Sequence, residues 1–514
     1  MADILLSTLN ARYIHAAFGL RYLQANLPEA LQNRARVREF DVQQRPMDIV
    51  ENLLSEQPRI IGFGVYIWNA TATHEVVALL RKAAPEIVIV LGGPEVSYEW
   101  ESQPLVALAD FVITGEADVA FGELCLDVLD RRPPAGKILS PPLPDLAKLR
   151  LPYTLYSDED LAHRVVYVEA SRGCPFTCEF CLSSIDLPVR AFPLESFLDE
   201  MDRLLARGLL QLKFVDRTFN LHLPTSRRIL EYFLDRQRPG LFLHFEMVPD
   251  RLPDALRDVI RKFPPGSLQF EVGVQTFNPE VATRIRRKQN LSKLEDNLQF
   301  LRRETGVHVH ADLIAGLPGE TMESFAEGFN RLVALRPQEI QVGILKRLRG
   351  TPISRHDQEF AMAYSPLPPY EILRTRDLTF AQVRQLSRFS RYWDLMANSG
   401  NFAEALPCLW KGGLSPFAGF TEWSNWLHQR LGARHGIALA TLFEALHTFL
   451  VDFRQFESAA AGEILARDYL RPGRKDPPEF LRPWLPQSAP SHTSATTRLL
   501  PRRQARHTAG AKVS

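Results

Sequence analysis

The stretch VYVEASRGCPFTCEFCLSS, residues 166–184, determines how the rest of the chain is interpreted. It begins as a short apolar strand and continues into a loop with three cysteines, Cys174, Cys178 and Cys181. Three thiolates on one loop can bind a soft metal centre, whereas structural zinc usually takes four ligands, often as two separated pairs. The spacing therefore favours an iron–sulfur cluster in which one iron has no protein ligand. A zinc site completed by distant ligands and a trio of buried loop cysteines are the alternatives.

The composition of the chain excludes several classes of protein. Its 514 residues carry a formal charge of +1, which gives no bulk electrostatic reason to expect nucleic acid or a membrane as a partner. Five cysteines are too few for a disulfide-built scaffold, and Cys125 and Cys408 are interpreted as ordinary thiols. The first residues resemble no signal peptide, and no apolar run of about eighteen residues occurs, so we expect a cytoplasmic protein.

Residues 1–140 alternate short apolar runs with amphipathic helical patterns. We expect strands at 3–9, 36–42, 59–67, 87–93 and 110–116. Apolar strands that alternate with helices indicate a doubly wound parallel sheet of the Rossmann-like type, and such sheets bind ligands at the carboxyl ends of their strands. The Pro-rich stretch 141–163 is predicted to be a linker, because its prolines forbid regular helix.

A second alternating series fills residues 164–352. Its strands are expected at 165–170, 210–216, 241–247, 267–275, 308–317 and 339–346. Six strand–helix units predict a partial (β/α)6 TIM-like barrel. Residues 353–475 are expected to form an α-helical C-terminal domain, and residues 476–514 a disordered tail, because they are rich in Ser, Thr, Ala and Arg. The predicted fold class is therefore α/β, with a helical domain at the C-terminal end.

The spacing of the three cysteines after the first barrel strand resembles that of the radical S-adenosylmethionine (SAM) superfamily. The resemblance implies that Cys174, Cys178 and Cys181 hold a [4Fe–4S] cluster whose open iron is chelated by the amine and carboxylate of SAM. One-electron reduction then cleaves SAM to a 5′-deoxyadenosyl radical, which abstracts a hydrogen from the substrate. The resemblance also implies that Phe180 lies near the adenine of SAM, with core packing as the alternative role for this ring.

Three later segments resemble the branch of that superfamily that includes the oxygen-independent coproporphyrinogen oxidase. They are FEMVPD (245–250), EVGVQTFNPEVATRIRRKQN (271–290) and ADLIAGLPGET (311–321). Each contains or follows the end of an expected strand, and the C-terminal ends of barrel strands face the pocket.

This resemblance implies a role for one side chain or more in each segment. Glu246 would bind the SAM amine, and Arg287 would approach the SAM carboxylate, as opposite charges require. Gln275 and Asp312 would contact the methionine or ribose part of SAM. The chain departs from the family after the second barrel strand, where a glycine-rich patch is replaced by FVDRTFN. Asp216 in that segment is a further candidate for SAM, with a solvated turn as the alternative.

A doubly wound domain ahead of this barrel resembles the cobalamin-binding radical SAM enzymes. Gly92, Gly93, Gly115 and Glu116 follow the fourth and fifth expected strands, fit the usual signatures of those enzymes, and are the candidates for binding cobalamin. The Asp-x-His-x-x-Gly motif of better-known cobalamin domains is absent. His15 is an alternative axial ligand, but the residues around it do not match that motif.

The segments NARYIHAAFGLRYL and ILKRLRGTP extend the resemblance to a family of such proteins with an uncharacterised C-terminal domain. The resemblance implies a radical SAM enzyme with a [4Fe–4S] cluster, SAM and cobalamin, which methylates an unactivated carbon of a small molecule. An external electron donor of the flavodoxin or ferredoxin type is the implied protein partner. Radical rearrangement or cyclisation with cobalamin, methylthiolation of RNA, and a non-enzymatic cobalamin or redox sensor are the alternatives.

Overall fold

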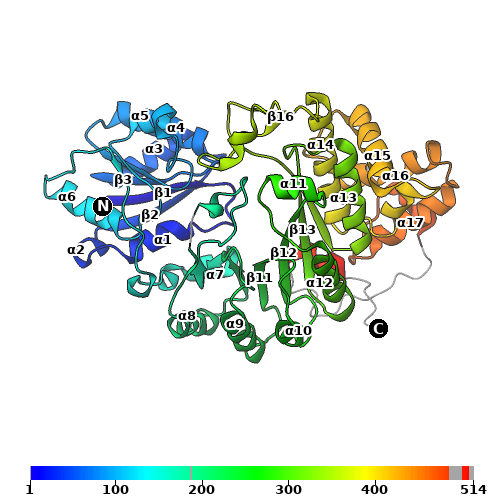
Figure 1. The fold of residues 1–514 in the computed structure, drawn as a ribbon, viewed down its shortest axis with the longest axis horizontal. Helices are drawn as coiled ribbons and strands as arrows, with labels where there is room; N and C mark the ends of the chain where they lie inside the picture. The colour runs from blue at the N-terminus through cyan, green and yellow to red at the C-terminus, as the bar shows by residue number, and fades with distance from the viewer. Residues whose placement is uncertain (1, 186–187, 486–500, 509–514) are drawn as a thin grey trace. The chain divides into compact units, whose positions relative to one another are not determined.

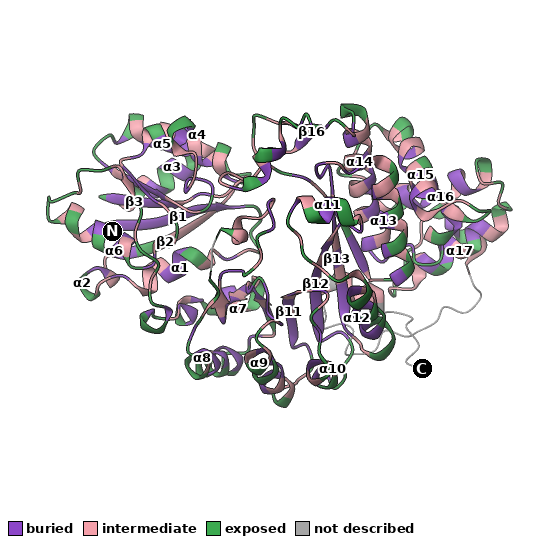
Figure 2. Cartoon of the chain, in the orientation of Figure 1, coloured by how far each residue is buried: buried purple, intermediate pink, exposed green. Residues whose placement is uncertain are grey.

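The computed structural model describes residues 2–185, 188–485 and 501–508, and it contains two compact units (Figure 1). The first unit comprises Met1–Arg217, Lys346–Ser354 and Ser365–Glu371, and the second comprises Thr218–Leu345, Arg355–Tyr364 and Ile372–Ser514. Within each unit the strands are mostly buried, and the helices present an exposed outer face (Figure 2). No helix in the described ranges is long and apolar enough to cross a lipid bilayer.

The first unit is built around a parallel six-stranded sheet with the strand order β2-β1-β3-β4-β5-β6. The strands are β1 Ile4–Asn10, β2 Ala35–Asp41, β3 Ile60–Gly64, β4 Val88–Gly92, β5 Phe111–Ile113 and β6 Ile138–Leu139. The helices are α1 Phe18–Ala25, α2 Glu29–Gln32, α3 Pro46–Ser55, α4 Ala70–Ala83, α5 Pro104–Leu108 and α6 Ala120–Leu129. The predicted doubly wound parallel sheet is confirmed.

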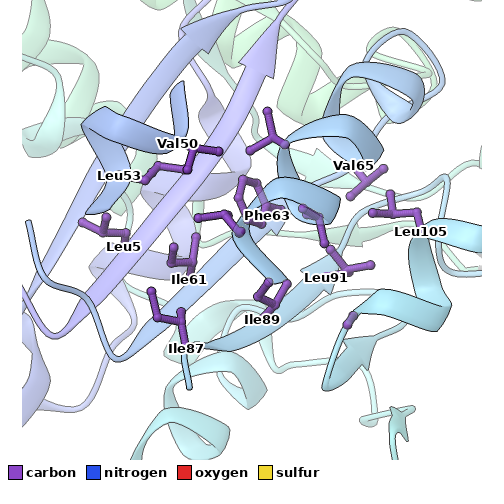
Figure 3. Close-up of a cluster of buried hydrophobic side chains, with 14 of the residues drawn as sticks. Leu5, Val50, Leu53, Ile61, Phe63, Val65, Ile87, Ile89, Leu91 and Leu105 are labelled. Carbon is purple, nitrogen blue, oxygen red and sulfur yellow. The ribbon is translucent and has the colours of Figure 1, made fainter. Parts of the chain in front are cut away.

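Two hydrophobic cores, one on each face of this sheet, explain its alternating sequence. Leu5 belongs to the core under α3, α4 and α5, which Figure 3 shows with Phe63 and Leu91 among its side chains. Its neighbours Ile4 and Leu6 belong to the other core, with residues of α1, α2 and α6. Successive side chains of a strand point to opposite faces, so a strand covered on both sides must be apolar throughout.

The structure corrects two element boundaries in this unit. The run 59–67 was expected to be strand throughout, but β3 ends at Gly64, and Val65–Trp68 form a loop at the carboxyl edge of the sheet. β6 was not predicted, because it lies within a Pro-rich region. Lys137–Leu139 is free of proline, and the carbonyls of Lys137 and Leu139 accept hydrogen bonds from the Val112 and Thr114 N–H groups.

The Pro-rich stretch 141–163 packs against the first unit. It forms two short 3-10 turns, Leu146–Lys148 and Tyr153–Leu155, and then α7 Asp158–His163. Tyr153 and Tyr156 are fully buried. Leu146 and Leu149 of the segment form a small separate hydrophobic cluster with Tyr22 and Phe192, and the segment therefore acts as a structural strap.

The second alternating series has the six strands that the sequence predicts, and α-helices connect them. In the first unit, β7 Val166–Val168 pairs in parallel with β10 Gln211–Phe214, and α8 Leu194–Ala206 connects them. In the second unit, β11 Phe242–Met247, β12 Leu268–Gln275, β13 His308–Ala315 and β14 Glu339–Ile344 pair in parallel in chain order. Their helices are α9 Leu223–Asp235, α10 Asp254–Ile260, α11 Pro279–Arg284, α12 Leu291–Glu304 and α13 Met322–Leu335.

The C-terminal region is helical, as predicted, and it covers the edge of β14. Its main helices are α14 Phe380–Trp393, α15 Pro416–Leu431, α16 Leu439–Asp452 and α17 Ser458–Leu470. Directly after α14, the Asn398 amide donates to the Ile340 carbonyl and accepts from the Ile340 N–H, both at 2.9 Å. A side chain thus satisfies backbone groups that a neighbouring strand would otherwise pair with.

The prediction of a disordered tail at 476–514 is wrong where the structure describes that segment. A 3-10 helix spans Glu479–Trp484, and α18 spans Arg502–Thr508. Arg503 donates to Glu339 and to Asp394, each at 2.9 Å, so α18 packs at the amino end of β14. A basic residue of the segment that was expected to be disordered instead pairs with the buried Glu339 and the half-buried Asp394. Residues 486–500 and 509–514 lie outside the described ranges.

Candidate functional site

The three cysteines lie on a loop that begins directly after the first strand of the second series. The antiparallel pair β8 Ser171–Arg172 and β9 Arg190–Ala191 closes this loop at its base. Gly173 has a φ of +93°, which a glycine adopts without strain, and turns the chain into Cys174. Cys174 and Cys178 are buried, and Cys181 is half-buried.

The chemistry of the donor set fits an iron–sulfur cluster. Burial raises the pKa of the Cys174 thiol, and the nearby Cys181 and Cys178 add to the rise. Iron–sulfur clusters are held by cysteine thiolates, and three cysteines on one loop can each bind a different iron of a [4Fe–4S] cluster.

Asp216 fixes the start of this loop. Its carboxylate accepts hydrogen bonds from the Ala170 N–H at 3.0 Å and from the Ser171 hydroxyl at 2.6 Å. Burial raises the pKa of Asp216 to about 7. The observed contacts are therefore structural, and the predicted contact of Asp216 with SAM stays a prediction.

A cavity of about 250 Å³ opens at the carboxyl edge of the first sheet. Its lining includes the four residues predicted to bind cobalamin, Gly92, Gly93, Gly115 and Glu116, together with Gly62 and Gly64. These glycines lie at or just beyond the ends of β3, β4 and β5, so the structure brings the predicted residues together at the expected edge.

Two of the glycines keep this cavity open in different ways. Gly93 has a φ of +105°, and a Cβ there would lie 2.5 Å from the Val65 carbonyl oxygen. Gly115 has a φ of +68°, and a Cβ there would meet no atom within 4 Å. Backbone at these positions can approach a bulky ligand closely.

Sequence reasoning missed an aromatic pair beside the cavity. Tyr66 lines the cavity and stacks on Trp68 with 4.4 Å between ring centroids. Trp68 is 52% exposed, which is unusual for an indole without a partner surface. The sequence VYIWN could have indicated this pair, but the strand predicted at 59–67 extended over Tyr66 and so excluded a loop there. The alternative ligand His15 instead bonds through Nδ1 to the Tyr167 hydroxyl at 2.7 Å.

The loop after β4 is held by a segment that returns from beyond β14. Arg349 donates to Glu95 at 3.0 Å, and the Tyr370 hydroxyl donates to the same carboxylate at 2.6 Å. Arg347 donates to both oxygens of Glu99 at 2.9 and 3.1 Å. The segment ILKRLRGTP therefore has a structural role on the first unit.

In the second unit, polar side chains occupy one face of the sheet. The register pairs Glu246 with Glu271, Glu271 with His310, and Gly273 with Asp312. Paired residues of parallel strands share a face, and so do residues two apart on one strand. Glu246 and Asp312 therefore lie on the same face, as a common role at SAM requires.

Gln275 and Arg287 meet at the carboxyl end of β12. Gln275 has a φ of +70° and follows an irregularity in the register, an arrangement that strains a residue with a side chain. The Arg287 guanidinium donates to the Gly273 carbonyl, and a Cβ on Gly273 would lie 2.5 Å from Gln275 Nε2. Gln275 Oε1 is buried and accepts no hydrogen bond from the described part of the chain. A strained residue with an orphaned acceptor fits a ligand-binding position.

Two further buried groups on this unit are titratable. His310 Nε2 lies 3.2 Å from Asp312 Oδ1. Burial lowers the pKa of His310, but Asp312 and the nearby carboxylates outweigh burial and raise it to about 9. Glu320 follows the predicted Gly-Pro-Gly turn and accepts from Thr276 at 3.0 Å and Ser324 at 2.9 Å. Burial raises its pKa to about 7.

Comparison with known proteins assigns a family to each part of the chain. A model of the B12 binding domain matches residues 5–125, and a model of the radical SAM superfamily matches residues 168–332. A model described as a protein of unknown function (DUF4080) matches residues 358–506.

Individual relatives and solved structures are similar to large parts of the chain. The cobalamin-dependent radical SAM methyltransferase TokK of Streptomyces tokunonensis is 24% identical over 438 residues, which are 76% of this chain and 61% of TokK. The chain thus spans less than two thirds of the length of that relative. TsrM, a radical SAM methyltransferase of Kitasatospora setae solved with tryptophan and a SAM analogue, has a TM-score of 0.56 at 18% identity, over 68% of this chain and 74% of TsrM.

OxsB, a cobalamin-dependent SAM radical enzyme solved with aqua-cobalamin and SAM, has a TM-score of 0.58 at 13% identity. It covers 94% of this chain and 83% of its own, and at this identity it shows the fold alone. The cysteine loop, the glycine-lined cavity and the three matched models agree with one another. The chain thus contains three matched regions, a B12 binding domain at 5–125, a radical SAM domain at 168–332 and a DUF4080 region at 358–506.

Proposed function

We propose that this chain is a cobalamin-dependent radical SAM enzyme that methylates an unactivated carbon of a small molecule. The observation that carries the proposal is that the glycine-lined cavity and the cysteine loop lie close together within the first unit. Arg172 lines the glycine-rich cavity and precedes Cys174 by two residues. When bound, the cluster supplies an electron for SAM cleavage and cobalamin supplies a methyl group.

The residues of the chain would hold these groups by ordinary complementarity. Cys174, Cys178 and Cys181 supply thiolates, and Phe180 supplies a flat surface for adenine. Gly93 and Gly115 leave room for a cobalamin substituent at the carboxyl edge of the sheet. The 250 Å³ cavity suits a part of cobalamin, and the exposed Trp68 adds apolar surface beside it.

Four residues of the second unit would recognise SAM. Glu246 offers a negative charge to the amine, and Arg287 offers donors to the carboxylate. The orphaned Gln275 Oε1 can accept from a hydroxyl or an amine. Asp312 offers carboxylate oxygens to a ribose hydroxyl or an amine, and His310 Nε2 lies 3.2 Å from its Oδ1.

The proposal requires an external one-electron reductant of the flavodoxin or ferredoxin type. The test is anaerobic turnover of the reconstituted protein with SAM and a chemical reductant. We expect 5′-deoxyadenosine from the wild type, none from Cys178→Ala, and unchanged release from Cys408→Ala, whose thiol is buried elsewhere. SAM left uncleaved by a cluster-loaded wild type would refute the proposal.

Methylation and the alternative radical outcomes differ in their products. Methyl transfer consumes one SAM for the methyl group and one for the radical, so S-adenosylhomocysteine and 5′-deoxyadenosine are released together. Rearrangement or cyclisation releases 5′-deoxyadenosine without S-adenosylhomocysteine. The ratio of the two products with a candidate substrate therefore distinguishes these reactions.

A further inference from the structure

The base of the cysteine loop is tied to the rim of the cavity by one acidic residue. Arg172 and Arg190 lie opposite each other in the β8–β9 pair that closes the loop. Both guanidinium groups donate to Glu116, with Arg172 Nη1 at 2.7 Å. Glu116 lines the cavity. The two strands of the loop base therefore converge on a cavity residue.

Arg172 is held firmly at this junction. It donates to both oxygens of Asp118 at 2.9 and 3.0 Å, and to Glu169 at 2.9 Å. Its guanidinium lies 4.6 Å from the centre of the Tyr22 ring. The side chain is only 13% exposed, so water screens these interactions weakly. A lysine could not replace the planar guanidinium that donates to three carboxylates at once.

The rim contacts continue across the cavity to the loop after β4. The Gly115 N–H donates to the Ser97 hydroxyl at 3.1 Å, and that hydroxyl donates to the Gly93 carbonyl at 2.9 Å. Hydrogen bonds therefore connect Gly93 through Ser97 to Gly115, the peptide bond connects Gly115 to Glu116, and a further hydrogen bond connects Glu116 to Arg172. Arg172 is two residues before Cys174. Such a physically connected network can carry coupling between two sites.

We propose that Glu116 and Arg172 couple occupancy of the cavity to the order of the cysteine loop. A ligand pressed against Gly115 and Glu116 fixes the rim, and the rim fixes the base of the loop through the two arginines. Glu116 is then a positioning residue that acts through Arg172 and Arg190. This inference rests on the proposed function, because it takes cobalamin as the occupant and the cluster as the cargo of the loop.

Coupling between two binding events is reciprocal. Aquacobalamin should slow amide exchange in residues 173–185 of the cluster-free wild type. Reconstitution of the cluster should in turn raise the affinity for aquacobalamin, by about fivefold or more. Neither readout requires turnover.

Glu116→Gln tests the link, since it removes the charge and keeps the size. Because Glu116 lines the cavity, the variant is compared at saturating aquacobalamin, and its affinity is compared only with its own affinity without the cluster. We expect the protection of residues 173–185 to be lost, and the cluster to change the affinity for aquacobalamin by a factor of about one. Arg172→Lys should behave in the same way. This second variant shows whether the effect comes from the contact between the two residues or from Glu116→Gln alone. Asp3→Asn is the matched control, because Asp3 pairs with Arg34 at 2.8 Å before β1 and β2 begin, at the amino edge of the sheet.

The outcomes separate this inference from the proposed function. If the wild type binds neither aquacobalamin nor a cluster, the proposed function fails. If it binds both, and Glu116→Gln and Arg172→Lys retain the wild-type protection and affinity factor, the coupling role is overturned while the proposed function stands. Loss of the affinity factor in Asp3→Asn as well would also overturn it, because any charge change would then suffice.

Discussion

At the residue scale, most of the predicted site residues lie at or near the ends of strands. The position of a strand end is well recorded in the sequence. Gly92, Gly93 and Gly115 were found because glycine follows an apolar run, and all three line one cavity. The contacts of Glu116 with Arg172 and Arg190 were invisible in the sequence. They join residues 56 and 74 positions apart, and only folding brings those residues together.

Gly93→Ala should destabilise the first unit much more than Gly115→Ala. Both positions have positive φ, which costs about 1–2 kcal/mol for an alanine. Only at Gly93 would the added methyl group also lie 2.5 Å from a backbone oxygen, so we expect a total loss of at least about 3 kcal/mol there. Urea unfolding measures both variants. Equal losses would contradict the cavity geometry.

Glu320 should make the second unit less stable as the pH rises. Its folded pKa of about 7 lies above the ordinary 4.5, so folding favours the protonated form. Stability is fully present below about pH 4.5 and is lost as the pH rises through 7, by an amount on the order of 3 kcal/mol. Glu320→Gln should lose less stability than the wild type between pH 5 and pH 8 in urea unfolding. Parallel curves for the two proteins would exclude this role.

At the scale of elements, the hydrophobic periodicity predicted the two series of strands and helices. It failed where pairing between distant segments decides whether a strand forms or where it ends. The strand expected at 59–67 ends at Gly64, because the chain turns there to place Tyr66 at the cavity. β6 forms in a Pro-rich region because β5 offers an open edge. No local pattern reports either event, since both depend on neighbours distant in sequence.

Asn398→Ala should destabilise the sheet of the second unit by about 2–4 kcal/mol. The substitution leaves the N–H and carbonyl of Ile340, which is 4% exposed, without their side-chain partner. Asn52→Ala, on the exposed face of α3, is the control and should change stability by less than about 0.5 kcal/mol. Thermal unfolding compares the two, and similar midpoints would contradict the edge-covering role.

Arg503→Met should destabilise the second unit through Glu339. That carboxylate is 2% exposed and binds His308 and Arg503, which hold its pKa down to about 2 against the effect of burial. Loss of one cation from a buried acid costs about 3 kcal/mol, whereas Arg467→Met breaks an exposed pair and should cost under about 1 kcal/mol. If denaturant unfolding finds equal losses, α18 does not stabilise the barrel end.

At the scale of the whole molecule, the chain combines a B12-binding domain, a radical SAM domain and a DUF4080 region. The order of domains and the cysteine spacing could be predicted from the sequence, because each is recognised from residues that are close together along the chain. The substrate was not, since substrate recognition depends on side chains gathered from many elements. The near-neutral charge agrees with a small molecule and identifies none.

The central claim is that one chain binds both a [4Fe–4S] cluster and cobalamin. Its most direct test is the quantification of iron, sulfide and corrin in protein reconstituted anaerobically and freed of unbound cofactor. The account predicts about four irons, about four sulfides and about one corrin per chain. Cys178→Ala should lose the iron and sulfide and keep the corrin. A wild type that retains only one of the two cofactors would contradict the account.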